Sequence, residues 1–420
     1  MATSDTSPRL PSLSVVTIGH YRHGKTSLTA AITRVLADQP GGHATPIRVQ
    51  ELDRRGGPGA LLDPPETTRT VCAGSVRYTT EHRDYVHVDC PGHRPWLKNA
   101  ARAQALADAA VLVVSAVDSI RPQTHEHLLL ARALGLRQLV IFINKCDLVT
   151  DLEWLDLVER DIRELLDRCG FDGNTVRILR GAALPALMGD AAWQPAIRDL
   201  VEALETDMTV PAHDSDGPPL YYVHAAHDLR QSPRDVVVEG RLRRGTLRRH
   251  DRLTLLGFGA ALQLRIEDME VFRQKVDVAR AGDRVGLQLH SVDHALRALT
   301  TFAGQAVVPR ESAATARFRA RIDMLPAREG GHPTGVWSRV VVHLLFGAAA
   351  MAGTIEVPGG GMVLHGDSAE VLIDLRAPLY LEPGMPFVMR NGNQGAGWKR
   401  GAPALWGGTV GSGVVLGVGV

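Results

Sequence analysis

Eight residues near the start of the chain have the spacing of a phosphate-binding loop: Gly19-His20-Tyr21-Arg22-His23-Gly24-Lys25-Thr26. In the pattern G-x-x-x-x-G-K-T, glycines let backbone N–H groups surround phosphate oxygens and the lysine reaches the outer phosphates. The hydroxyl of the last residue ligates Mg²⁺. The sequence therefore predicts nucleotide binding by Gly19, His20, His23, Gly24, Lys25 and Thr26, with Thr26 also a metal ligand. The alternative is a chance match in a glycine-rich chain.

Two later segments carry the other groups that a guanine nucleotide site needs. Asp89 ends an apolar segment, where a carboxylate suits the Mg²⁺ sphere, and Gly92 lets a backbone N–H approach a γ-phosphate. Asn144-Lys145-Cys146-Asp147 follows the apolar run 139–143, and the Asp147 carboxylate can accept two hydrogen bonds from guanine. Adenine offers no matching donors, and sites of this kind discriminate by roughly 10⁴-fold or more. Asn144, Lys145 and Asp147 are therefore predicted to bind GTP.

These motifs need strands before them and helices after them, and the first half of the chain alternates in that way. We expect strands at 13–18, 85–89, 110–115, 139–143 and 176–179, and helices at 27–36, 94–107, 122–134, 151–168 and 190–206. This alternation predicts an α/β fold with a doubly wound, mostly parallel sheet. The loop 38–65 is long and rich in glycine and proline, which is typical of a functional segment.

After a linker at 207–218 the pattern changes to short β-branched segments such as 235–242, 252–256 and 284–289, as a small β-barrel requires. A second all-β unit begins near 309–315. We therefore predict a P-loop GTPase domain followed by two β-barrel domains. The expected boundaries are a disordered tail at 1–12, a GTP-binding domain at 13–210, and barrels at 211–308 and 309–420.

The composition is that of a globular protein and excludes several classes. Of 420 residues, 45% are hydrophobic and 22% charged, and no apolar run reaches membrane-spanning length. The net charge of +1 gives no global attraction to nucleic acid. The four cysteines have no metal-type spacing, and Cys90 and Cys146 lie inside nucleotide motifs. We expect a cytoplasmic monomer without a membrane partner.

The chain resembles the elongation factor Tu family of translational GTPases, most closely its bacterial members. The resemblance is carried by Gly19–Thr26, His87-Val-Asp-Cys-Pro-Gly-His93, Pro122-Gln-Thr-His-Glu-His127 and Asn144–Asp147. It continues in 280–286 and 409–413. It implies a GTP/GDP switch with Mg²⁺ that delivers aminoacyl-tRNA to the ribosome, with a nucleotide exchange factor as a further partner.

The resemblance also implies roles for single residues. His93 orients the attacking water, Thr70 ligates Mg²⁺ in the GTP state, and Glu270 contacts tRNA. The backbone of Ala182, Ala183 and Leu184 meets the guanine edge. The alternatives are that Thr70 is an ordinary strand-start residue and that His93 has no special role.

Several positions depart from the family pattern. Tyr21 and Arg69 replace small-to-medium apolar residues beside the catalytic histidine, and Arg22 replaces the aspartate of the loop. These changes leave the rate of hydrolysis open. The alternative is that Arg22 and Arg69 are solvated charges. The pocket that binds the amino acid in the family is also changed. The positions that match it here are Ser75, 225–227, Leu229 and Arg284. The acidic pair of the family is missing, and Arg284 replaces an asparagine. Basic residues cluster at 241–249, where they either contact phosphate or form the solvated face of a hairpin. Compared with the family, residues 393–406 form an insertion. The competing hypothesis is a GTP-dependent regulatory switch that no longer binds aminoacyl-tRNA.

Overall fold

The structure is a computed structural model. It describes residues 10–39, 43–49, 74–90, 97–228, 234–271, 274–291, 304–326, 335–390 and 409–419. The chain forms two compact units, the first made mainly by residues up to Pro211 and the second mainly by Ala212 onward. Each unit is described by itself. None of the described helices is long and apolar enough to cross a membrane.

A seven-stranded sheet forms the centre of the first unit, in the order β2-β3-β4-β1-β5-β6-β7. The five strands from β4 to β7 in this order are parallel, whereas β2 and β3 pair antiparallel at one edge. All seven residues of β5 are buried, as expected of a central strand covered on both faces. The strands are β1 Ser12–Ile18, β2 His43–Ala44, β3 Gly74–Thr79, β4 Asp84–Asp89, β5 Ala109–Ser115, β6 Gln138–Asn144 and β7 Ile178–Arg180.

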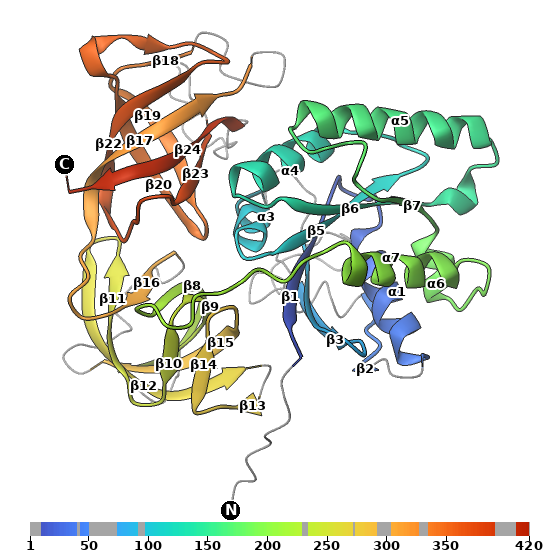
Figure 1. Cartoon of the computed structure of the whole chain (residues 1–420), viewed down its shortest axis with the longest axis horizontal. Coiled ribbons are helices and arrows are strands. Elements are labelled where there is room, and N and C mark those ends of the chain that lie inside the picture. Colours follow the sequence, from blue (N-terminus) through green and yellow to red (C-terminus); the bar gives the residue numbers. More distant parts are fainter. Residues whose placement is uncertain are drawn as a thin grey trace, which may run out of the picture. The chain divides into compact units, whose positions relative to one another are not determined.

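Helices cover both faces of this sheet (Figure 1). One core cluster joins α1, α6 and α7 to the strands, and Figure 1 shows α3, α4 and α5 on the opposite face. In α5 the apolar positions Leu155, Val158, Ile162 and Leu165 recur at helical spacing and are buried. The helices are α1 Lys25–Ala37, α3 Leu97–Gln104, α4 Pro122–Ala133, α5 Leu152–Arg168, α6 Ala183–Leu187 and α7 Gln194–Thr206, with a 3₁₀ turn η3 at Cys146–Leu148.

The second unit begins with a closed barrel. Its strands run in the order β11-β16-β8-β9-β15-β12, and β12 pairs back with β11. Alternate residues such as Val236, Val238 and Leu242 point into an apolar core. The strands are β8 Leu220–Asp228, β9 Asp235–Arg244, β11 Arg252–Gly257, β12 Ala260–Val271, β15 Arg284–Ser291 and β16 Ala306–Val308, with short β10 Thr246–Arg248, β13 Gln274–Lys275 and β14 Val278–Arg280 beside them.

A second closed barrel follows, in the order β17-β22-β20-β19-β23-β24. Phe318, Phe346 and Phe387 meet in its core at ring-centre distances of 5.2–6.0 Å. Its strands are β17 Thr315–Met324, β19 Val340–Phe346, β20 Ala349–Glu356, β22 Ser368–Leu379, β23 Pro386–Arg390 and β24 Thr409–Val418, with a small pair β18 Val336–Trp337 and β21 Met362–Val363 and a 3₁₀ turn η6 at Pro358–Gly360.

The predicted fold class is confirmed: an α/β domain with a mainly parallel sheet precedes two closed six-stranded barrels. Individual elements differ from expectation. The helix predicted at 190–206 begins only at Gln194 and has Pro195 in its first turn. A separate short helix α6, which was not predicted, precedes it and ends just before Gly189, whose backbone is left-handed (φ 95°). The antiparallel strands β2 and β3 were not predicted. Ser12 already belongs to β1, and residues 1–9 of the expected tail lie outside the described residues.

Candidate nucleotide-binding site

The phosphate-binding loop leaves β1 and enters α1, as its sequence predicts. Gly19 and Gly24 have positive φ angles of 131° and 90°, which L side chains rarely adopt. A Cβ on Gly19 would lie 2.3 Å from the Val113 carbonyl oxygen, and one on Gly24 would lie 2.2 Å from Nδ2 of Asn144. Both positions therefore require glycine for space as well as for conformation.

Lys25 is the buried cation of this loop. It is only 6% exposed, and its Nζ donates a hydrogen bond to the His20 carbonyl at 2.8 Å. Burial lowers the pKa of Lys25 to about 8, while Asp89 and Cys90 act in the opposite direction. An ammonium group held in this way gains from any anion that enters the loop, because an anion restores the charged form that burial disfavours.

Thr26 and Asp89 lie together on the side of the loop facing β4. The Thr26 hydroxyl donates to Oδ2 of Asp89 at 2.6 Å, and Asp89 is buried at the end of its strand. A hydroxyl and a carboxylate are hard oxygen donors of the kind that Mg²⁺ prefers, and Mg²⁺ commonly uses few protein ligands besides phosphate and water. The two side chains therefore fit a bound Mg²⁺, which would neutralise phosphate charge there.

Two neutral histidines accept hydrogen bonds from backbone N–H groups at the loop and at the end of β5. The Gly19 N–H donates to Nδ1 of His127 at 3.3 Å, and the Ser115 N–H donates to Nδ1 of His23 at 3.2 Å. Burial lowers the pKa of both imidazoles to about 3, so each ring keeps a lone pair for its N–H donor. In addition, the Gln123 amide oxygen accepts from the Tyr21 N–H at 3.3 Å.

His127 and Gln123 had no assigned role in the sequence-based prediction. Both come from α4, about one hundred positions after the loop. Only the segment Pro122–His127, which carries part of the family resemblance, pointed to this region. The contact itself depends on the packing of α4 and is not visible in local spacing.

Asn144 joins the phosphate loop to the turn before α6. Its Nδ2 donates to the His23 carbonyl at 2.9 Å, and its Oδ1 accepts from the Ala183 N–H at 2.8 Å. The side chain is 2% exposed. Asn144 thus holds two loops in position, and the Ala183 N–H, predicted to meet guanine, is engaged by this amide. Ala182 is likewise buried, whereas Leu184 is 58% exposed.

The predicted base-recognition carboxylate is accessible. Asp147 lies in the turn η3 and is exposed. Lys145, just before this turn, has a left-handed backbone (φ 64°) and its Nζ lies 3.6 Å from Oδ2 of Asp118. Asp118 also accepts from the Ser115 hydroxyl at 2.8 Å, and this hydrogen bond is the largest cause that holds its pKa below the ordinary value, with Lys145 contributing.

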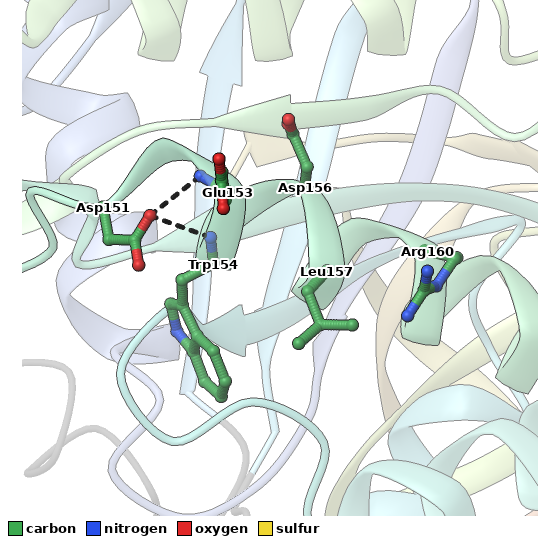
Figure 2. A pocket seen from close by; sticks show the side chains of 6 residues that line it. All are labelled: Asp151, Glu153, Trp154, Asp156, Leu157 and Arg160. Atoms are coloured by element: carbon green, nitrogen blue, oxygen red, sulfur yellow. Dashed lines mark hydrogen bonds between the residues drawn. The ribbon is translucent and has the colours of Figure 1, made fainter.

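A hollow of about 630 Å³ lies at the start of α5, shortly after Asp147 (Figure 2). Its lining is part of the helix start: Asp151 accepts from the backbone N–H groups of Glu153 and Trp154 at 3.0 and 3.3 Å. The Trp154 indole N–H donates to the Ala116 carbonyl at 2.8 Å. These contacts anchor the start of α5 to the loop after β5. The hollow is therefore lined by residues that hold the helix start in place.

Some of the remaining predicted positions are described by the structure and others are not. In the second unit, Glu270 is exposed near the end of β12, and Arg284 begins β15. Ser75 is exposed in β3. The other group lies outside the described residues: Thr70, Gly92 and His93, together with Arg69, Leu229 and the segment 393–406.

A comparison with known protein families gives one match. Residues 10–209 match the model of the family described as Elongation factor Tu GTP binding domain. The matched range covers the whole central sheet and the loop–helix site described above. The match shows that this part of the chain is similar to the GTP-binding domain of that family.

Proposed function

We propose that this protein, whose first domain matches a GTP-binding domain of translational GTPases, hydrolyses GTP and delivers aminoacyl-tRNA to the ribosome. The observation that carries the proposal is the buried Lys25 ammonium at the head of α1, beside the paired Thr26 and Asp89. Such an arrangement is suited to binding a polyphosphate together with Mg²⁺. We place the protein in the cytoplasm.

Each residue of the site has a defined part in the proposed reaction. Lys25 and the loop N–H groups bind the β- and γ-phosphates, and Thr26 with Asp89 holds the metal. Asp147 accepts from the guanine edge, with Asn144 keeping its surroundings in place. Bound Mg²⁺ supplies charge neutralisation at the phosphates. Gly92, His93 and Thr70 retain the parts that the family resemblance implies for them, with His93 orienting water.

Base recognition gives the first test. Changing Asp147→Asn replaces one acceptor oxygen by a donor, so guanine loses charge-assisted hydrogen bonds. At about 1.5–3 kcal/mol for each of two bonds, we expect GDP affinity to fall by about 10²–10⁴-fold. Calorimetry with GDP, ADP and Mg²⁺ measures this. Equal binding of GDP and ADP by the unchanged protein would remove the basis of the proposal.

Ribosome dependence tests the translational part. GTP turnover is measured with purified protein alone and with ribosomes, and we expect stimulation only in their presence. A charged tRNA is then added with excess GTP, and protection of its ester from hydrolysis is followed by filter binding. Glu270→Ala should weaken this protection, since Glu270 is exposed for contact with the tRNA.

A second candidate function has its own observation. Arg284, at the position where the family has an asparagine, lies opposite Arg241 and not opposite an acid. A cationic surface does not favour the free ammonium of an aminoacyl group. The second candidate is a GTP-dependent regulatory switch without tRNA binding. It predicts GTP binding with no ester protection and no stimulation by ribosomes.

A further inference from the structure

Two arginines face each other across strands of the first barrel. Arg284 on β15 is the register partner of Arg241 on β9. Their neighbours Leu242 and Val285 point into the apolar core, so both arginines lie on the outer face of the sheet. Arg241 is nevertheless only 1% exposed. Two arginines of the same charge are therefore cross-strand neighbours on the outer face of the barrel, and one of them is buried.

The charge of Arg284 is incompletely matched within the described part of the chain. Nη1 of Arg284 is buried and has no hydrogen-bond partner among the described residues. Glu239 lies on the same face, and its Oε1 is 3.1 Å from Nε2 of His227. Burial lowers the pKa of Arg284, Arg241 lowers it further, and Glu239 partly opposes both. A buried guanidinium donor without an acceptor is costly, so the arrangement favours an added anion.

The neighbouring position leaves room for one. Gly286 lies two residues after Arg284 on the same face of β15, between Glu239 and Glu270 in the register. A Cβ placed on Gly286 would meet only Glu270, at an ordinary contact distance of 3.8 Å. Space beside Arg284 is therefore not filled by a side chain of its own strand.

We propose that Arg284, supported by Arg241, binds an oxyanion on the outer face of the first barrel, either a carboxylate or a phosphoryl group. Planar guanidinium groups donate pairs of N–H bonds that match the oxygens of these anions. The site lies in the second unit and uses none of the nucleotide-binding residues. Arg284 also stands at a position of the family's aminoacyl pocket, but anion binding there can fail or succeed independently of GTP binding and hydrolysis.

The test uses the full chain with saturating GDP and Mg²⁺, so that the phosphate-binding loop is already filled. Inorganic phosphate and acetate are titrated separately at constant ionic strength, and thermal unfolding is recorded. The variants are Arg284→Gln and Arg284→Lys. The matched control is Arg280→Gln, which removes an exposed arginine from the neighbouring strand β14.

We expect one or both anions to raise the unfolding temperature of the wild type and of the control. In Arg284→Gln the half-saturating anion concentration should rise at least about tenfold, because a charge-assisted bond is lost. A response to phosphate alone assigns a phosphoryl ligand, and a response to acetate alone assigns a carboxylate.

A direct signal covers the case in which Arg284→Gln does not fold. The arginine Nε–H resonances of the wild type are followed during the same titrations, and Arg284→Lys identifies the resonance of Arg284 by its loss. A shift of that resonance upon addition of an anion supports the site. Unchanged unfolding temperatures together with an unshifted resonance, or an Arg284→Gln response equal to that of the wild type, overturns it.

Discussion

Asn144 offers the sharpest test of how the nucleotide site is held together. Replacing Asn144→Ala removes the amide that joins the His23 carbonyl to the Ala183 N–H, at 2.9 and 2.8 Å. Both backbone groups would then lie buried without their present partner. Each such group costs about 1–3 kcal/mol, so the free energy of unfolding of the first domain should fall by about 2–6 kcal/mol.

The same change should weaken nucleotide binding, although Asn144 is assigned no contact with phosphate. Without the amide, ligand binding must restore the relative position of the two loops. Each 2 kcal/mol spent in this way raises the Kd for GDP about 30-fold. Gly24→Ala should act in the same direction, since its Cβ would lie 2.2 Å from Nδ2 of Asn144.

The assay combines urea denaturation of the nucleotide-free protein with calorimetric titration of GDP. Asn174→Ala is the matched control, because Asn174 is an exposed asparagine of the same domain. If Asn144→Ala unfolds at the same urea concentration as the control and binds GDP within about threefold of it, the two hydrogen bonds do not have the role given to them here.

Three further predictions follow from charges in the structure. GDP binding near pH 9 should take up about one proton in the wild type and none in Lys25→Met, because Lys25, with a pKa lowered to about 8, becomes charged again beside phosphate; calorimetry in two buffers measures the uptake, and equal uptake in both proteins refutes it. The first domain should lose stability as pH falls from 6.5 toward 3, because burial lowers the pKa of His87 to about 3 and only the unfolded chain takes up a proton on this residue in that range. His87→Gln should reduce the dependence of the unfolding free energy on pH. An unchanged pH dependence contradicts the argument. Arg244 and Glu382 join the two barrels at 2.8 and 3.2 Å in a partly exposed pair, so a double-mutant cycle with alanine at both positions should give a coupling of about 0.5–1 kcal/mol, whereas strictly additive effects would rule the coupling out.

Local sequence patterns predicted the parts of the fold that local chemistry determines. The glycine positions of the loop, the mostly apolar strand β5 and the helix α5 were all visible from spacing. The short strand β3 was missed, because its residues alternate in burial over only six positions and pair antiparallel beside a parallel sheet. The short helix α6 was not predicted, because its five residues are too few for a helical period to show.

The site was predictable to the same extent. Lys25, Thr26 and Asp147 belong to contiguous motifs, so their residue types and spacing indicate their chemistry directly. The residues that hold these motifs in place act across 108 positions in the case of His127 and 39 in the case of Asn144 with Ala183. Such contacts arise from the way α4 and β6 pack in three dimensions, which no local period encodes.

The last strand has a consequence for how the protein is made. β24 lies between β17 and β23 and pairs with both, so Phe318 meets a register partner one hundred residues later, at Val418. Until residues 409–418 emerge during synthesis, β17 and β23 present unpaired edges that other chains can join. Folding of this barrel must therefore await the end of translation of β24, and a chain cut before Thr409 should aggregate even though its first domain is intact.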